Sequence, residues 1–482
     1  MSLQPLLPAE ALAANFKEIK PPLRPQEALL EASRCLYCFD APCIMACPTG
    51  IDIPTFIKKI AFGNPAGAAR TILTANILGA SCARVCPTQV LCAGACVLED
   101  RDEQPIQIGR LQRFATDYVE QHGLKVLPPP PARKSGKRIA VIGAGPAGLG
   151  CAAELAQLGH EVTIFEKQAQ AGGLNTYGIA YYKMKPEVSL AEVELVRSLG
   201  VELRCGVTVG KDVTVAQLEK DYDALFLGLG LGAATRLRVP GEDLPEVLDA
   251  LEFIAHLRSH PLEQVPVGRS VAVIGCGNTA IDAVTQSKRL GAGRAFVVYR
   301  RGESDMSAYD FEYELAKADG AAFVFHAVPL EVIGADGHVT GLRLARTRVV
   351  NGRAEVIPGS DFVEPCDLVL KAVGQEKQVA MLHELFPDLQ TDARGVIQCD
   401  PATGRTNRPH IFTGGDCANG GREVVNAVGE GKKAAHAIHA SLTHAGAVPR
   451  VQPSRLGARS GATGSGLHNP IRAHELEKAL KK

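Results

Sequence analysis

A short apolar strand that runs into a glycine loop and then a helix occurs twice in this chain, and this pattern restricts the fold most. The first copy, residues 138–148, contains Gly143-x-Gly145-x-x-Gly148, and the strand after its helix ends at Glu166. Gly143 allows a tight turn, Gly145 lets the backbone approach a pyrophosphate, and Gly148 lets the helix pack on the strand. An acid at the end of the second strand can bond a ribose hydroxyl. The pattern predicts a dinucleotide-binding fold.

The second copy begins at Ser270 and contains Gly275-x-Gly277-x-x-Ala280. Two such folds in one chain predict two dinucleotides. The first fold, with its acid, indicates FAD, and the second indicates a nicotinamide cofactor. The chain then returns to the first fold at Gly415-Asp416, followed by a final helix. Asp416 can bond a ribityl hydroxyl, although a plain Gly-Asp turn is the alternative.

The second strand of the second fold ends in Arg300-Arg301 instead of an acid. Guanidinium groups at this corner suit a 2′-phosphate, and a solvated arginine pair is the alternative. Glu303 and Asp305 lie close in the sequence and would oppose an additional phosphate. The choice between NADPH and NADH therefore stays open at this point.

Eight of the 14 cysteines lie in the first 100 residues, in two groups of four. In a reducing cytosol, clustered cysteines are more often metal ligands than disulfides. Zinc ribbons favour paired C-x2-C knuckles and often recruit histidine, but this region has one such pair and no histidine before His122. The spacing predicts two iron–sulfur clusters and leaves open which four ligands share each one. The two groups are Cys35, Cys38, Cys43, Cys47 and Cys82, Cys86, Cys92, Cys96.

These patterns predict an α/β protein with a small all-helical domain in front. Apolar residues at helical intervals predict helices over about 51–62 and 65–75, and metal binding would contribute to folding there. Four consecutive prolines mark a stiff linker. We expect a helical iron–sulfur domain at 1–126, a linker at 127–136, an FAD domain of the glutathione-reductase type at 137–262 and 375–444, an NAD(P) domain at 263–374, and a flexible tail at 445–482.

Charge and apolar content exclude some functions. Lys+Arg and Asp+Glu are both 52, so the chain lacks the basic excess that is typical of nucleic-acid binders. No apolar run reaches the roughly 18 residues of a membrane span, and no secretory signal is visible. We expect a cytoplasmic protein without a nucleic-acid or membrane partner.

The cysteine groups, the FAD fold and the inserted nicotinamide fold together resemble the N-terminal half of dihydropyrimidine dehydrogenase and its separate bacterial flavoprotein subunit. Residues 77–96 and 104–114 carry this resemblance, which covers about residues 23–440. The glutamate synthase small subunit belongs to the same superfamily. The resemblance implies a subunit that passes a hydride from NADH (or NADPH) to FAD, then single electrons through two [4Fe-4S] clusters. No side chain acts as an acid or base in this step, and cofactor geometry alone suffices.

The electrons would reach an FMN-containing catalytic subunit of dihydropyrimidine dehydrogenase, which interconverts uracil or thymine and the 5,6-dihydropyrimidine. A glutamate synthase small subunit that feeds a glutamate-forming partner is the alternative, and the segment around Gln112 argues against it. A zinc-bound, non-catalytic assembly factor is a third hypothesis, which the complete glycine loops disfavour.

The resemblance also implies the ligands of each cluster. Cys82 would be a packed thiol, because the family uses a glutamine amide in its place. One cluster would take Cys35, Cys38, Cys43 and Cys96, and the other Cys47, Cys86, Cys92 and Gln112.

Cofactor contacts follow by position in the same way. Lys183 stands where the animal enzyme has an arginine, and Ser307 stands where it has a basic residue for NADPH, which favours NADH here. The implied FAD contacts are Gly145, Pro146, Ala147, Glu166, Gly173, Leu174, Lys183, Gly415 and Asp416. The implied nicotinamide contacts are Gly277, Asn278, Thr279, Arg300 and Arg301. Gly143, Gly148, Gly275, Ala372, Gly374 and Val424 complete the predicted cofactor-binding set.

Overall fold

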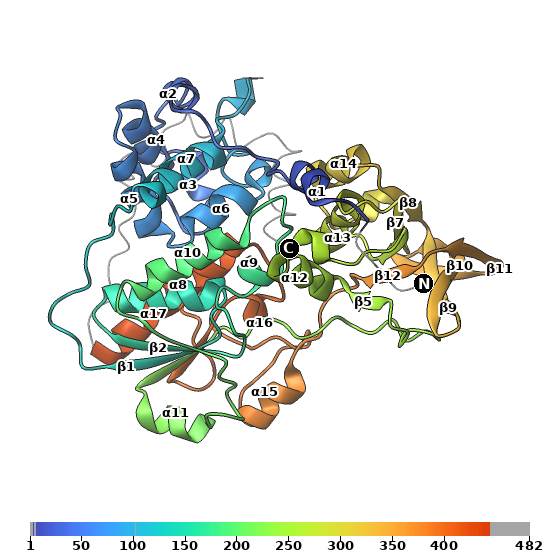
Figure 1. The fold of residues 1–482 in the computed structure, drawn as a ribbon. Coiled ribbons are helices and arrows are strands. Elements are labelled where there is room, and N and C mark those ends of the chain that lie inside the picture. Colours follow the sequence, from blue (N-terminus) through green and yellow to red (C-terminus); the bar gives the residue numbers. More distant parts are fainter. Residues whose placement is uncertain (1–2, 4–5, 102, 444–482) are drawn as a thin grey trace. The chain divides into compact units, whose positions relative to one another are not determined.

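The computed structural model describes residues 3, 6–101 and 103–443 (Figure 1). The tail that the sequence predicts to be flexible, 445–482, lies outside the described residues. The chain divides into two compact units, each built from three segments. Among the described residues, unit 1 consists of those up to Ile19, Thr176–Pro186 and Gly232–Glu376, and unit 2 of those in 20–175, Glu187–Leu231 and those from Lys377 onward.

The N-terminal part of unit 2 is helical, as the sequence predicts. Asp52 and Asn64 cap two of its helices by accepting hydrogen bonds from the backbone N–H groups of Thr55 and Gly67, and a proline stands in each first turn. A buried core that includes Phe56 joins the helices. The elements are α2 (Pro25–Ser33), α3 (Pro42–Met45), α4 (Ile53–Ala61), α5 (Pro65–Ala75), α6 (Gly79–Val85), η1 (Thr88–Val90), η2 (Glu99–Arg101) and α7 (Ile108–Gln121).

A five-stranded parallel sheet forms the rest of unit 2, in the order β13-β4-β1-β2-β3. Its central strands are apolar and buried, as expected for parallel strands covered on both faces. The strands are β1 (Arg138–Ile142), β2 (Glu161–Glu166), β3 (Glu202–Cys205), β4 (Ala224–Leu227) and β13 (Ile411–Thr413).

Two helices of this sheet domain, α8 (Pro146–Gln157) and α17 (Val424–Thr443), pack closely because glycines lie where they meet. A Cβ atom added at Gly431 would lie 2.1 Å from the carbonyl oxygen of Ala147. The other helices are α9 (Leu174–Tyr177), α10 (Pro186–Arg197), α11 (Val215–Asp221), α15 (Val379–Leu385) and α16 (Asp416–Asn419).

Unit 1 holds a second parallel sheet, in the order β5-β12-β6-β7-β8, and a three-stranded antiparallel sheet, β11-β10-β9. The parallel strands are β5 (Val247–Asp249), β6 (Ser270–Ile274), β7 (Arg294–Tyr299), β8 (Ala322–Phe325) and β12 (Leu368–Lys371). The antiparallel strands are β9 (Ala327–Ala335), β10 (His338–Val350) and β11 (Arg353–Pro365). The helices are α1 (Ala9–Asn15), α12 (Ala250–Ser259), η3 (Leu262–Gln264), α13 (Asn278–Arg289), η4 (Glu303–Asp305) and α14 (Asp310–Ala318).

The domain boundaries differ from those expected. The sequence extends the FAD domain to residue 262, but β5 pairs with β12 in the second sheet, so Gly232 onward belongs to unit 1. Residues 6–19 also belong to unit 1, because Leu12 and Phe16 are buried in its core. The α/β prediction is confirmed, but local patterns do not reveal strand pairing across more than 100 residues. None of the described helices is long and apolar enough to cross a membrane.

Candidate cofactor-binding sites

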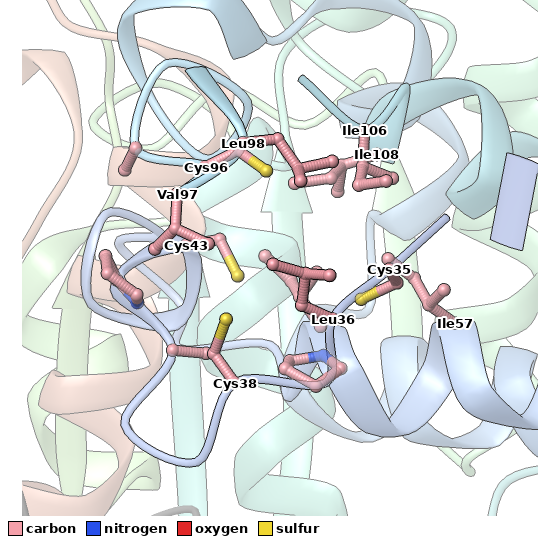
Figure 2. A pocket seen from close by; sticks show the side chains of 15 residues that line it. Cys35, Leu36, Cys38, Cys43, Ile57, Cys96, Val97, Leu98, Ile106 and Ile108 are labelled. Atoms are coloured by element: carbon pink, nitrogen blue, oxygen red, sulfur yellow. The ribbon is translucent and has the colours of Figure 1, made fainter. Parts of the chain in front are cut away.

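The first cysteine site is a pocket in the helical part of unit 2. Cys35, Cys38, Cys43 and Cys96 all line it, and Figure 2 shows their thiols directed into the same space. The remaining lining is apolar and includes Leu36 and other aliphatic side chains. Burial raises the pKa of the Cys43 thiol, and nearby thiols add to the effect. The pocket thus brings together the four cysteines that the resemblance implies for one cluster.

The second cysteine site is a separate pocket. It is lined by Gln112 and by Cys47, Cys82, Cys86 and Cys92. The buried Gln112 side chain donates a hydrogen bond from Nε2 to the carbonyl oxygen of Gly79 at 2.7 Å. This bond commits the amide nitrogen, which leaves Oε1 as the atom that Gln112 can offer as a ligand.

Cys82 is the fifth donor in the second pocket. Its side chain is only 3% exposed, and its backbone carbonyl accepts from the Cys86 N–H at 3.1 Å. A hydrogen bond with the Cys82 side chain raises the pKa of the Cys86 thiol, and burial raises it further. The packing expected for Cys82 is present, but the thiol also borders the site.

The donor sets fit a multi-atom cluster. Within the residues that the structure describes, no three Cys, His, Asp or Glu side chains converge closely enough to hold a single metal ion. The thiols instead surround two cavities, and the second includes a neutral amide. Cysteine thiolates around a cavity are the usual ligands of iron–sulfur clusters.

The first glycine loop follows β1 in unit 2. Gly143 has a φ of 100°, and a Cβ atom there would lie 2.4 Å from the carbonyl oxygen of Gly228. A Cβ atom at Gly148 would lie 2.0 Å from the carbonyl oxygen of Gly143. Both positions therefore require glycine. Pro146 and Ala147 then begin α8, whose N-terminal N–H groups suit a pyrophosphate.

The predicted acid lies beside this loop. The buried Glu166 carboxylate accepts hydrogen bonds from the backbone N–H groups of Ala144 and Gln168, each at 2.8 Å. Gly173 also lies close to the glycine loop, because a Cβ atom at Gly173 would lie 2.8 Å from the Cα atom of Gly145. Leu174 follows and is 41% exposed. The structure thus gathers these predicted FAD residues around one loop.

Gly415 and Asp416 also reach the start of α8. Gly415 has a φ of 77°, and a Cβ atom there would lie 2.9 Å from the Cβ atom of Ala147. Its N–H donates to Glu430 at 2.7 Å, and burial raises the pKa of that carboxyl. Burial also raises the pKa of Asp416, which accepts from the Arg422 N–H at 3.2 Å. The sequence did not single out Glu430, whose spacing within a helix gives no local signal.

The second glycine loop, in unit 1, repeats the geometry of the first. Gly275 has a φ of 120°, and a Cβ atom there would lie 2.2 Å from the carbonyl oxygen of Ala372. A Cβ atom at Gly277 would lie 3.2 Å from the Ser307 hydroxyl oxygen, so Ser307 borders the loop. Asn278 and Thr279 begin α13, and Gly374 has a φ of 97° beyond β12.

The two arginines after β7 lie among mixed charges. The Arg301 guanidinium is 3.8 Å from the Asp305 carboxylate and 5.6 Å from the centre of the Tyr299 ring. The Arg300 carbonyl accepts a hydrogen bond from the Thr347 hydroxyl at 2.8 Å, which fixes the backbone at the strand end. The Asp305 carboxylate therefore offsets part of the positive charge that would bind a 2′-phosphate.

Lys183 occupies a buried ion cluster in unit 1. Its Nζ atom lies 2.7 Å from Asp282 and 2.6 Å from Glu312, and the Tyr182 hydroxyl donates to Asp282 at 2.9 Å. Burial lowers the pKa of Lys183, but the two carboxylates outweigh burial and raise it above its ordinary value. Lys183, which the resemblance implies as an FAD contact, is therefore held by two carboxylates of the nicotinamide fold.

Comparison with known proteins assigns a family to each part. Residues 12–124 match the family described as dihydropyrimidine dehydrogenase domain II, 4Fe-4S cluster, and residues 137–431 match the pyridine nucleotide-disulphide oxidoreductases. Among solved structures, FprA from Mycobacterium tuberculosis is 21% identical with a TM-score of 0.53. The match covers 72% of this chain and 90% of the FprA chain. Thioredoxin reductase from T. acidophilum is 20% identical with a TM-score of 0.50, and the match spans 63% of this chain and 99% of that one. These likenesses concern the fold.

Two kinds of relative are about equally similar over most of the chain. The glutamate synthase (NADPH) small chain of Halomonas elongata is 36% identical over 452 residues, which is 89% of this chain and 94% of the relative. The NAD-dependent dihydropyrimidine dehydrogenase subunit PreT of Escherichia coli K12 is 35% identical over 422 residues, 88% of this chain and 96% of the relative. The chain therefore belongs to the family of the glutamate synthase small chains and PreT, as an NAD(P)H-oxidising flavin and iron–sulfur electron-transfer subunit.

Proposed function

We propose that this chain is the electron-input subunit of a dihydropyrimidine dehydrogenase, and that its partner is an FMN-containing subunit that interconverts uracil or thymine and the 5,6-dihydropyrimidine. The observation that carries the proposal is Gln112. It lines the second cysteine pocket with its amide nitrogen held by Gly79, which leaves its oxygen for a cluster.

The chain's own residues position the cofactors. When bound, FAD accepts a hydride from NAD(P)H, and iron–sulfur clusters pass single electrons onward. The loop at Gly143–Gly148 and the start of α8 would hold the pyrophosphate of FAD, with Glu166 on the ribose. Asp416 would contact the ribityl chain. The loop at Gly275 and Gly277 would hold the nicotinamide cofactor.

Two cluster sites are proposed on the pocket linings. Cys35, Cys38, Cys43 and Cys96 would hold one [4Fe-4S] cluster in the first pocket. The second pocket offers Gln112 and four cysteines, of which Cys47, Cys86 and Cys92 would be ligands. Replacing one thiolate by a neutral amide makes the site less negative and raises its reduction potential.

NADH is the proposed electron donor. Ser307 borders the second glycine loop without bringing positive charge, and Asp305 lies 3.8 Å from Arg301. Both features weaken binding of a 2′-phosphate. Because Arg300 and Arg301 are present, we expect NADPH to be used with lower efficiency.

A glutamate synthase small subunit is the second candidate, because its relatives are as similar as PreT. The two are separated by assaying the anaerobically purified chain with each type of partner. NADH oxidation that depends on uracil and the FMN-containing subunit supports the first proposal. NADH oxidation that depends on glutamine, 2-oxoglutarate and a glutamate synthase large subunit would replace it with the second.

A further inference from the structure

Glu192 is a buried acid that joins the flavin fold to the helical part of unit 2. It lies on α10, is 4% exposed, and receives three hydrogen bonds from the first turn of α6. Its Oε1 atom accepts from the backbone N–H groups of Ala80 at 2.8 Å and Ser81 at 3.0 Å. Its Oε2 atom accepts from the Ser81 hydroxyl. One carboxylate thus fixes the turn from a distant part of the sequence.

The same turn of α6 borders the second cysteine pocket. Gly79, the residue before Ala80, accepts the hydrogen bond from Gln112 Nε2. Cys82, the residue after Ser81, lines the pocket together with Gln112. Glu192 therefore holds the segment that orients the amide proposed as a cluster ligand.

The positive charge of Arg84 acts on Glu192. Arg84 on α6 is 6% exposed, donates to the Ala80 carbonyl oxygen at 3.1 Å, and pairs with Asp117 of α7 at 2.8 Å. Arg113 of α7 pairs with the same Asp117 at 3.1 Å, so the two arginines and one aspartate together keep one net positive charge. On α10 itself, the buried residue one turn earlier is the uncharged Ser189.

Burial raises the pKa of Glu192 to about 7, because desolvation of the carboxylate outweighs the donors of Ser81 and Ala80 and the charge of Arg84. The carboxyl group therefore changes charge near neutral pH. A negative charge beside a redox centre makes the addition of an electron less favourable, and the effect is strong in a dry interior.

We propose that Glu192 is a positioning residue for electron transfer. It fixes the α6 turn that orients Gln112, and its charge sets the reduction potential of a cluster in the second pocket. The inference rests on the proposed function, because it concerns a cluster held there. Glu192 takes up one proton from water when that site gains one electron from the reduced flavin, and it releases the proton when the electron leaves.

The test compares the anaerobically purified full-length wild type with Glu192→Gln. Reduction potentials are measured by titration with electron paramagnetic resonance detection between about pH 6 and pH 8, around the pKa of the carboxyl. We expect the wild-type potential of the second site to fall as pH rises. Glu192→Gln keeps the higher, low-pH potential throughout, while NADH still reduces its flavin within about twofold of the wild-type rate, since ~0.4 kcal/mol corresponds to that factor.

Three further variants sharpen the result. Glu192→Asp keeps the charge, so we expect the pH dependence to return. Ser81→Ala removes a hydrogen-bond donor to the Glu192 carboxylate, which raises the pKa of Glu192. The pH range in which the reduction potential changes therefore moves upward. Glu154→Gln is the matched control, because Glu154 is a glutamate of the same fold that pairs with His436 at 3.0 Å and Lys432 at 3.5 Å and does not line either cysteine pocket.

Each outcome decides the inference. Loss of iron from Glu192→Gln alone, with iron retained in Glu154→Gln, supports the positioning role. A fully loaded Glu192→Gln protein with the wild-type potential and pH dependence overturns it. If Glu192→Gln does not fold, an unshifted pH profile in Ser81→Ala overturns it instead. A wild type without iron contradicts the proposed function itself, which is a separate failure.

Discussion

The Lys183 ammonium lies 2.7 Å from the Asp282 carboxylate inside unit 1 and 2.6 Å from the Glu312 carboxylate. Replacing this lysine leaves two buried carboxylates without their shared cation. Breaking a buried ion pair in this way costs about 3–5 kcal/mol. We therefore expect Lys183→Met to lower the urea concentration at which unit 1 unfolds, measured by circular dichroism.

A suitable control is Lys317→Met. Lys317 pairs with Glu314 at 2.7 Å on the surface, where both side chains are at least 41% exposed, and such pairs contribute little to stability. Equal unfolding midpoints for the two variants would contradict the assignment of Lys183 to the folded core of unit 1.

Cys82 and Cys86 lie one helical turn apart and line the same pocket, yet we expect different consequences when each is replaced. Cys86→Ala removes a proposed ligand and loses about half of the iron, whereas Cys82→Ala retains all of it because Gln112 completes the site. Iron and acid-labile sulfide analysis of anaerobically reconstituted protein measures this. Comparable iron loss in the two variants would make Cys82 a ligand and remove that role from Gln112.

Gly275 meets the Ala372 carbonyl so closely that a methyl group cannot fit. In Gly275→Ala the new Cβ atom would lie 2.2 Å from that oxygen, at a φ of 120°. We expect reduction of the bound flavin by NADH to slow by roughly tenfold or more, since ~1.4 kcal/mol of strain gives that loss. Stopped-flow absorbance measures the rate.

Flavin content and reduction by dithionite stay unchanged in Gly275→Ala, because the FAD loop belongs to unit 2. Gly293→Ala is the control, since its Cβ atom would lie at an ordinary 3.5 Å from the Arg269 carbonyl oxygen. Loss of flavin in Gly275→Ala would show that this loop does not serve the nicotinamide cofactor alone.

His160 gives the flavin fold an acid-sensitive point. It is 2% exposed, its Nδ1 atom lies 2.8 Å from the Ser135 hydroxyl, and its Nε2 atom lies 2.8 Å from His439 Nδ1. Burial, with a contribution from His439, lowers the pKa of His160 from 6.5 to about 4. The folded protein therefore keeps this ring neutral where the unfolded chain is already protonated.

The stability contributed by neutral His160 is complete above pH 6.5 and is lost as pH falls toward 4. Each unit of pH in that range lowers the free energy of unfolding by at most ~1.4 kcal/mol. His160→Asn should flatten this slope in unfolding experiments at several pH values, and the exposed His383→Asn on α15 should leave it unchanged. A wild-type slope in His160→Asn would refute the assignment.

Local patterns in the sequence predict much of this fold. The apolar strands that begin at Arg138 and Ser270 and the glycines that follow them have the expected conformations, because the tight turns at Gly143 and Gly275 need a positive φ, which is a property of the local backbone. The helix that starts at Ile53 is marked by its Asp52 cap. Which cysteines share a cluster could be predicted only from the family resemblance.

Other features depend on distant parts of the chain. The pairing of β5 with β12 joins Val247 to Val369, and no nearby residue signals it. Glu192 was missed because a glutamate in a helix is usually solvated. Its spacing from the buried Ser189 and Val196, at i−3 and i+4, was the available signal that it faces inward.

Helix α1 completes the core of unit 1 although it precedes the rest of that unit in the sequence. Asn15 donates a hydrogen bond to the Arg289 carbonyl oxygen, 274 positions along the chain, and Leu12 is buried among residues of the same late segment. During synthesis α1 has no surface to pack against until most of the polypeptide has emerged from the ribosome. The last segment of unit 1 ends at Glu376, before β13 and α17 of the flavin sheet domain are made, so unit 1 can close around α1 while unit 2 is still incomplete.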